Sequence, residues 1–190
     1  MDMTINGKPA YLLKAIEREN HKIFEESLVV KDLCSGMLEQ INDSFINKYR
    51  YEIEFAALYR NLGLLITGTD PNGEIYKLHP KLSASALEHF GYSGPIRKIV
   101  SQHHERIDGT GYYNQLEEDI LEASKILITA DAFIGLMYDN DINNVAILEE
   151  KFKDSKCTET TLDIMKSTGK HKEEYIILLE NHLKKEGFLK

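Results

Sequence analysis

Apolar residues recur every three or four positions along most of this chain, and that spacing limits the fold more than any other feature. Such positions form one face of an α-helix because the helix repeats every 3.6 residues, whereas a half-buried strand alternates apolar and polar residues. The chain has no convincing strand pattern, no internal repeat and no low-complexity linker. We therefore predict an all-α fold in which each helix turns an apolar stripe toward a shared core.

The limits of the helices follow from these stripes and from residues that start or stop a helix. Proline is tolerated in the first turn of a helix, and Asp70-Pro71-Asn72-Gly73 is a strong turn signal. Helices are expected over residues 9–23, 30–45, 51–66, 79–90, 95–105, 117–138, 145–152, 162–165 and 175–183.

Length and composition describe an ordinary globular protein. The chain has 190 residues, of which 28% are charged and 42% are hydrophobic. This length suffices for one well-buried domain and is rather short for two, so residues 1–190 are expected to form a single helical domain. Cys34 and Cys157 are too few for a disulfide framework or a cysteine zinc site, and they are expected to behave as small hydrophobic residues.

Charge and hydropathy exclude two classes of partner. With a net charge of −8 the chain offers no general basic surface for duplex nucleic acid, so a phosphate ligand has to be met by a local cluster of donors. No apolar run approaches the length of a bilayer span, and residues 1–10 lack the charged-then-apolar pattern of a signal peptide. A cytoplasmic protein without a membrane partner is expected.

Two histidines in succession mark the most unusual stretch of the chain. His103 continues the apolar stripe of the helix expected over 95–105, and His104 lies one turn after Val100. Both imidazoles are thus expected to face the core. A single core histidine is usually satisfied by hydrogen bonds, but two adjacent ones, followed by the glycine-containing loop 108–113, favour a metal or phosphate site.

Two charged residues lie where the helical pattern calls for an apolar side chain. Arg60 falls on the inner face of the helix over 51–66, next to Asn61, and Asp131 is the sole charge in the apolar second half of the helix over 117–138. Arg60 either reaches water past its own stem, which this stretch alone favours, or faces an acid. Asp131 needs a cation, a hydrogen-bond donor, a metal or a proton.

Other polar side chains are expected to be solvated. His21, Glu25 and Glu26 lie near the join of the first two helices, and His171 and His182 lie among lysines and glutamates. Charged and polar residues in such surroundings are mostly exposed. None of these five residues is expected in a functional site.

Four short segments occur in a distinctive order between residues 53 and 138. They are Ala57-Leu58-Tyr59-Arg60-Asn61-Leu62-Gly63, then His79-Pro80, then His103-His104-Glu105 with Asp108-Gly109-Thr110-Gly111-Tyr112-Tyr113, and finally Ala130-Asp131.

This order resembles the HD-GYP branch of the HD-domain metal-dependent phosphohydrolases. The resemblance implies a single HD-domain-like helical bundle with further helices at both ends. It also implies a two- or three-metal centre, which in active members hydrolyses the phosphodiester bonds of cyclic di-GMP. Carried over by position, His79, His103 and His104 would bind one metal, and Asp131 would bind the other.

The departures from the family pattern bear on activity. Arg60-Asn61 stands where the family has its name-giving His-Asp pair, so a guanidinium replaces an imidazole and a neutral amide replaces the bridging carboxylate. Leu64 replaces a lysine that would contact phosphate, and Tyr113 replaces the proline of the loop. Asn61 and Asp131 therefore mark degenerate catalytic positions. Ligand contacts are expected at Arg60, Asp108, Gly109, Gly111, Tyr112 and Tyr113.

A charge argument suggests what replaces the second metal. If Arg60 occupies the place of the lost ligand, its guanidinium would lie close to Asp131 and stand in for the missing cation. The three histidines could still hold one divalent transition metal such as iron, manganese or zinc, but a metal-free protein is also consistent with the pattern.

Three functions remain open on this basis. The first is a degenerate module that binds cyclic di-GMP or another nucleotide, or a signalling protein through the loop 108–113, with little or no catalysis. The second is an active phosphohydrolase that uses a single metal on the three histidines. The third is a structural domain whose histidines are merely hydrogen-bonded in the core. The loss of the bridging carboxylate favours the first over the second.

Overall fold

The computed structural model describes residues 8–138 and 145–190, and every regular element in these two ranges is helical. The predicted all-α fold is therefore confirmed. Two short 3₁₀ helices lie at Tyr76–Leu78 and Glu117–Asp119. The α-helices are α1 (Lys8–Glu19), α2 (His21–Leu38), α3 (Ser44–Lys48), α4 (Arg50–Tyr59), α5 (Leu64–Thr67), α6 (His79–His89), α7 (Gly94–Gln102), α8 (Glu122–Met137), α9 (Val145–Lys153), α10 (Ser155–Thr168) and α11 (Glu173–Lys185).

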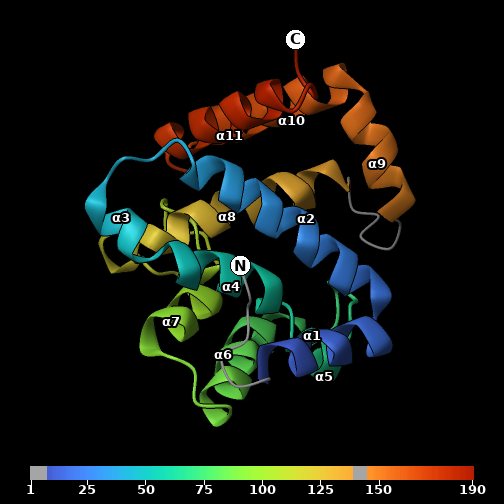
Figure 1. Cartoon of the computed structure of the whole chain (residues 1–190), viewed down its shortest axis with the longest axis vertical. Coiled ribbons are helices and arrows are strands. Elements are labelled where there is room, and N and C mark those ends of the chain that lie inside the picture. Colours follow the sequence, from blue (N-terminus) through green and yellow to red (C-terminus); the bar gives the residue numbers. More distant parts are fainter. Residues whose placement is uncertain (1–7, 139–144) are drawn as a thin grey trace.

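Helix α2 runs through the middle of the structure and packs against α1, α4, α8 and α11 (Figure 1). It begins where the Asn20 side chain accepts a hydrogen bond from the amide of Ile23, which satisfies one of the free donors of the first turn. Val30 and Met37 on its inner stripe are completely buried, as the periodicity predicts. Eight of its 18 residues are buried, and they contact neighbouring helices on several sides.

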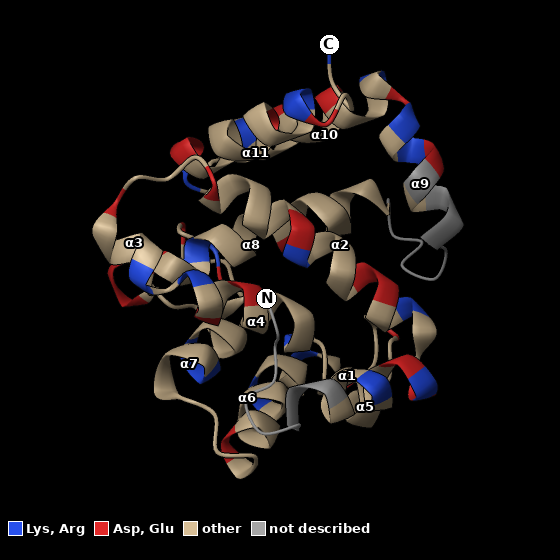
Figure 2. Cartoon of the chain, viewed as in Figure 1, with Lys and Arg blue, Asp and Glu red and all other residues tan. Residues whose placement is uncertain are grey.

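Helix α8 forms the other half of the core. Its side chains from Ala123 to Ile134 are all buried, and the helix carries few charges, in contrast to α1 and α11, where both signs occur (Figure 2). The pair α10 and α11 lies across α2 and α8 at one end of the structure, and α6 and α7 lie at the other end (Figure 1). A charged residue within α8 is thus surrounded by packed helices and must find a partner there.

Three helix limits differ from the prediction because a polar side chain caps a new helix. Asn20 caps α2, which begins at His21, so the helix expected over 9–23 ends at Glu19. Helix α2 ends at Leu38 rather than near Phe45, since Asp43 accepts hydrogen bonds from the amides of Phe45 and Ile46 and starts α3. Phe45 is consequently 51% exposed and is not a core residue. In the same way Asp154 caps α10, which is longer than the short helix expected over 162–165.

Two other predicted helices are interrupted. The helix expected over 51–66 ends at Tyr59, residues 60–63 form a turn, and α5 begins at Leu64. The helix expected over 117–138 begins with a 3₁₀ turn, and α8 itself starts only at Glu122. Because of the interruption after Tyr59, Arg60 and Asn61 lie in a turn and not within a helix.

The last three helices close the core on the side of α8. Leu148 and Phe152 of α9 are buried as predicted, while the side chains of Val145 and Ile147 lie outside the described residues. Glu122, at the start of α8, accepts hydrogen bonds from Lys172 and Tyr175, which fastens α8 to α11. Among the described residues, no helix is both long and apolar enough to cross a membrane.

Candidate functional site

Arg60 lies at the centre of the candidate site, and its side chain is completely buried. Its Nε donates a hydrogen bond to Oδ1 of Asp131 at 2.6 Å, and one terminal nitrogen donates to Oε1 of Glu26. The other terminal nitrogen donates to the Ala57 carbonyl at 2.9 Å and to Oγ of Ser27 at 3.5 Å. Two carboxylates and two neutral acceptors thus surround the guanidinium, which is the kind of hydrogen bonding that a buried cation requires.

The predicted pairing of Arg60 with Asp131 is confirmed, and the expectation that Arg60 reaches water past its own stem is wrong. The side chain stays buried because α4 and α8 pack together and bring the two charges face to face. A local reading of the helix over 51–66 could not find this partner, since Asp131 lies 71 positions further along the chain.

The second acid of the cluster is Glu26, and the expectation that this residue is solvated is wrong. It was expected to be solvated, yet its side chain is only 15% exposed, and it also accepts a hydrogen bond from Nδ2 of Asn61 at 3.1 Å. The signal that could have found it is its spacing, because Glu26 lies three residues after Ile23 and four before Val30 on the buried stripe of α2.

The electrostatics identify Asp131 as the firmly ionised acid of this cluster. Burial disfavours its charged form, but the Arg60 guanidinium, with His104 and His103 beside it, holds the pKa of Asp131 well below its usual range. Burial raises the pKa of Glu26, and Arg60 opposes that rise only in part. Arg60 therefore stabilises the ionised form of Asp131.

Ser83 and Gly63 hold the turn that carries Arg60 against α6. The Ser83 hydroxyl donates to the Arg60 carbonyl at 2.7 Å and accepts from the Gly63 amide at 2.7 Å. A Cβ atom on Gly63 would lie 2.3 Å from the carbonyl oxygen of His79, so this position requires glycine for close packing of the backbone. The turn and the first histidine are thus fixed relative to each other.

Three histidines from the start of α6 and the end of α7 converge beside this cluster. Nε2 of His79 lies 3.2 Å from Nε2 of His103 and 3.1 Å from Nε2 of His104. The possible ligand atoms of all three lie within 4.8 Å of one another. His79 and His103 are completely buried, and the side chain of His104 is 18% exposed. The expectation that both adjacent histidines face inward is confirmed.

Neighbouring carbonyl groups fix the tautomers of two of these rings. Nδ1 of His79 lies 2.7 Å from the Tyr76 carbonyl, and Nδ1 of His103 lies 2.7 Å from the Val100 carbonyl. A carbonyl oxygen can only accept, so both Nδ1 atoms donate their proton. Burial lowers the pKa of His103 to about 3 and also lowers the pKa of His79, so both rings are neutral near pH 7. Their Nε2 atoms therefore carry free lone pairs.

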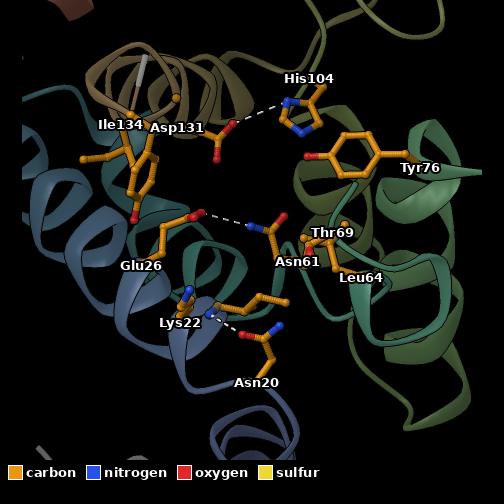
Figure 3. Close-up of a pocket in the computed structure, with 13 residues that line it drawn as sticks. Asn20, Lys22, Glu26, Asn61, Leu64, Thr69, Tyr76, His104, Asp131 and Ile134 are labelled. Carbon is orange, nitrogen blue, oxygen red and sulfur yellow. Dashed lines mark hydrogen bonds and ion pairs between the residues drawn. The ribbon is translucent and has the colours of Figure 1, made fainter. Parts of the chain in front are cut away.

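The ring of His104 also has an acceptor beside its Nδ1 atom. Nδ1 of His104 lies 3.4 Å from Oδ2 of Asp131, which favours the tautomer with the proton on Nδ1 (Figure 3). Burial lowers the pKa of His104 well below its usual value. Its Nε2 lone pair then faces that of His79.

Lone pairs that face each other at 3.1 to 3.2 Å repel unless a cation lies between them. Zinc–nitrogen bonds of about 2.0–2.1 Å in tetrahedral geometry separate two ligand nitrogens by roughly 3.3 Å, close to the observed spacing. The hydrogen bonds on the Nδ1 side are those that commonly orient metal-bound imidazoles. The donor set of His79, His103 and His104 thus fits one divalent transition metal.

A second metal does not fit the described residues. The carboxylates of Asp131 and Glu26, which could bind it, already hold the Arg60 guanidinium, and Asn61 contributes a neutral amide that donates to Glu26. A cation at this point would have to displace Arg60 and overcome its charge. Arg60 thus occupies the place of a cation.

The loop after the histidines is wrapped around a buried carboxylate. Glu105 is completely buried, and its two oxygens accept hydrogen bonds from the amides of Tyr113 and Gln115, each at 2.9 Å. A Cβ atom on Gly111 would lie 2.4 Å from Cα of Glu105, and Gly109 has a φ of +77°. The two glycines are therefore required by the tight course of the loop, which keeps it close to the metal-ligand candidates.

The side chains of the loop 108–113 face different surroundings. Tyr112 packs against His104 with ring centroids 4.5 Å apart and the ring planes tilted by 38°, whereas Tyr113 donates a hydrogen bond from its hydroxyl to the Lys77 carbonyl at 2.7 Å. Asp108 is exposed, and its carboxylate accepts from the amide and the hydroxyl of Thr110. Of the predicted ligand contacts in the loop, Tyr112 therefore lies against a histidine of the site, and the role of the others stays a prediction.

A pocket of about 110 Å³ opens onto the acid cluster (Figure 3). Glu26, Asn61, Tyr76, His104 and Asp131 point into it from α2, the turn after α4, the segment before α6, the end of α7, and α8. The pocket therefore joins both parts of the site, the paired charges and one of the histidines.

The comparisons with known proteins identify the family and the fold of the chain. The profile of the HD domain family matches residues 43–150, and the chain belongs to this family. No curated protein sequence matches the chain.

Solved structures of two other proteins have the same fold. The chain is similar to Bd1817, a HDG"Y"P protein from Bdellovibrio bacteriovorus, with 20% identity, a TM-score of 0.64 and 85% of this chain covered. It spans only 52% of Bd1817, about half of that protein. It is also similar to the HD domain of the L. monocytogenes phosphodiesterase PgpH, with 15% identity, a TM-score of 0.60, and 90% of this chain and 94% of that chain covered.

A second PgpH structure contains a nucleotide. It is the HD domain in complex with cyclic-di-AMP, with 14% identity, a TM-score of 0.61, and 96% of both chains covered. At these identities the likeness shows the fold alone.

Replacing Arg60 by methionine should be strongly destabilising. The change would leave Asp131 and Glu26 without their cation in a buried place, which typically costs about 3–5 kcal/mol. Urea unfolding at neutral pH measures the difference in free energy of unfolding. The matched control is Arg97→Met, which removes a partly exposed pair with Glu88 and should cost at most about 1 kcal/mol. Equal losses for the two variants would contradict the central place given to Arg60.

Proposed function

We propose that this chain is a degenerate member of the HD-GYP branch that binds a phosphorylated ligand at a single metal and hydrolyses it weakly or not at all. The observation that carries the proposal is the Arg60 guanidinium on Asp131 and Glu26. A buried positive charge at this point repels a second metal, and the residue that would bridge two metals is the amide Asn61. The proposal is therefore a binding or regulatory module of the HD domain family.

Each part of the site has a distinct task in this proposal. His79, His103 and His104 hold one divalent transition metal such as iron, manganese or zinc through their Nε2 atoms. The bound metal would act as a Lewis acid toward a phosphate oxygen. Asp131, 3.4 Å from Nδ1 of His104, orients that ring. Arg60 neutralises Asp131, and so keeps the acid from repelling an anionic ligand.

The nature of the ligand and partner follows from chemistry that the fold relatives share. The PgpH domain binds cyclic-di-AMP, and the resemblance of the motifs here points to cyclic di-GMP, so a nucleotide phosphate is the proposed ligand class. Tyr112, which packs against His104, would lie beside such a ligand, and the exposed Asp108 end of the loop is the proposed contact for a signalling protein.

Metal analysis of the purified chain should find one divalent metal per chain after loading with zinc or manganese. His103→Ala removes one of three buried donors, so its metal content should fall to near zero. Lys156→Gln, on the exposed surface of α10, is the control and should keep the wild-type content. A metal content of two in the wild type would rule the proposal out.

Turnover should be absent or very slow. Cyclic di-GMP and cyclic di-AMP, incubated with the metal-loaded chain, should show no linear product in chromatography, while titration calorimetry measures their binding. Readily detected linear product that disappears in His104→Ala would overturn the proposal and support a second candidate, a phosphohydrolase with a single metal. That candidate rests on the same three converging Nε2 atoms, because one metal can be sufficient to activate water.

Reverting the pair should restore a second metal. Arg60→His together with Asn61→Asp removes the cation, supplies an imidazole and a carboxylate, and leaves Asp131 free to bind. We expect the metal content to rise from one to two per chain, measured by elemental analysis on protein whose thermal unfolding remains cooperative. Arg60→His alone is the control, and it should stay near one because the bridging carboxylate is still missing. A folded double variant with a single metal would count against the assigned role of Arg60.

A further inference from the structure

A second pocket, of about 270 Å³, shares His104 and Asp131 with the pocket of Figure 3 but has walls of different charge. Its polar lining adds Arg106, just after the two histidines, and Lys170 and His171, from the connection between α10 and α11. The remaining lining is mostly apolar and comes from α8 and α10. This pocket therefore combines the edge of the histidine site with residues beyond the segment 43–150 that the family profile matches.

The two pockets differ in how much positive charge on their walls is left without an acid. The pocket of Figure 3 has Glu26 and Asp131 on its walls, together with Lys22. In the second pocket the acid is Asp131, which Arg60 already neutralises, and the cations are Arg106 and Lys170. An anion is therefore attracted to the second pocket more strongly than to the first.

Arg106 is available for an anion. One terminal nitrogen of its guanidinium donates to the Glu105 carbonyl at 2.8 Å, and the side chain forms no ion pair with any residue in the ranges 8–138 and 145–190. The side chain is partly buried, so its charge is less screened than that of a surface arginine. A guanidinium with free donors matches the geometry of phosphate oxygens.

The opposite wall is built onto the segment that carries Arg106. The amide of Ile107 donates to the Lys170 carbonyl at 3.2 Å, which ties the connection between α10 and α11 to the residues after the histidines. His171, expected from the sequence to be solvated, is only 8% exposed, which corrects that expectation. Its Nδ1 has no hydrogen-bond partner among the residues that the structure describes. An unpaired buried ring nitrogen in the wall of a pocket is the kind of group that a polar ligand satisfies.

We infer that this second pocket binds the phosphate group of a phosphorylated small molecule, with Arg106 and Lys170 as the binding residues. The inference rests on the proposed function and specifies where the ligand lies, because the pocket begins at His104 and Asp131. Its volume of about 270 Å³ is just below the usual range of about 300–1,000 Å³ for sites of drug-sized ligands. A phosphate with a small organic group suits it better than a whole cyclic dinucleotide.

The test is the affinity of the zinc-loaded full chain for inorganic phosphate, measured by titration calorimetry. Arg106→Gln should weaken binding about tenfold or more, because it removes a charge-assisted hydrogen bond from a partly buried place. Lys170→Gln should weaken binding by a smaller factor, since Lys170 is exposed and its loss cannot unfold the core. Lys156→Gln makes the same change of charge on exposed α10 away from the pocket, and it should bind like the wild type.

Metal content measured on the same samples separates this inference from the proposed function. If the wild type holds one metal but Arg106→Gln and Lys170→Gln both bind phosphate within twofold of the wild type, the pocket assignment is wrong. If the wild type binds no phosphate, the assignment is also wrong. If the wild type holds no metal while phosphate binding still depends on Arg106 and Lys170, the assignment stands and the single-metal function fails.

Discussion

The buried guanidinium of Arg60 is the interaction on which the rest of the site depends. It contacts Asp131 on α8 and Glu26 on α2, so one side chain joins the two central helices through charge. Burying two carboxylates here without a cation would cost free energy of folding, and so would burying the guanidinium without the carboxylates. The turn after α4, fixed by Ser83 against α6, makes this arrangement possible because it points Arg60 into the gap between the helices.

On the proposed function, the same pair would explain how a metal centre can lose one metal without collapse of the fold. In a site built for several metals, clustered acids are stabilised by the metals themselves, so losing one metal would leave an uncompensated charge. Here a covalently attached cation supplies that charge, and the histidines on the other side of Asp131 retain a geometry suited to one metal. Asp131 contacts both Arg60 and His104, so it connects the charge cluster to the candidate metal ligands.

The helices and the histidines could be predicted because both depend on local spacing. The apolar stripe of α8 and the position of His103 and His104 after Val100 follow from a period of 3.6 residues. The charge argument also found Arg60 and Asp131, since each was a charged residue without a local partner. Errors arose where a side chain gains its partner from a distant segment, as for Glu26, or where a cap such as Asp43 ends a stripe early.

The sequence alone determined that this protein is helical, that its candidate metal ligands are imidazoles, and that the pair at Arg60-Asn61 cannot bind metal as a His-Asp pair would. These properties depend only on the chemistry of individual residues and on the helical spacing of apolar residues along the chain. Only the tertiary structure decided that Glu26 completes the charge cluster, that the three Nε2 atoms face one another, and that Arg106 and Lys170 line a common pocket. The physical reason is that burial, lone-pair direction and charge compensation depend on which distant segments pack together.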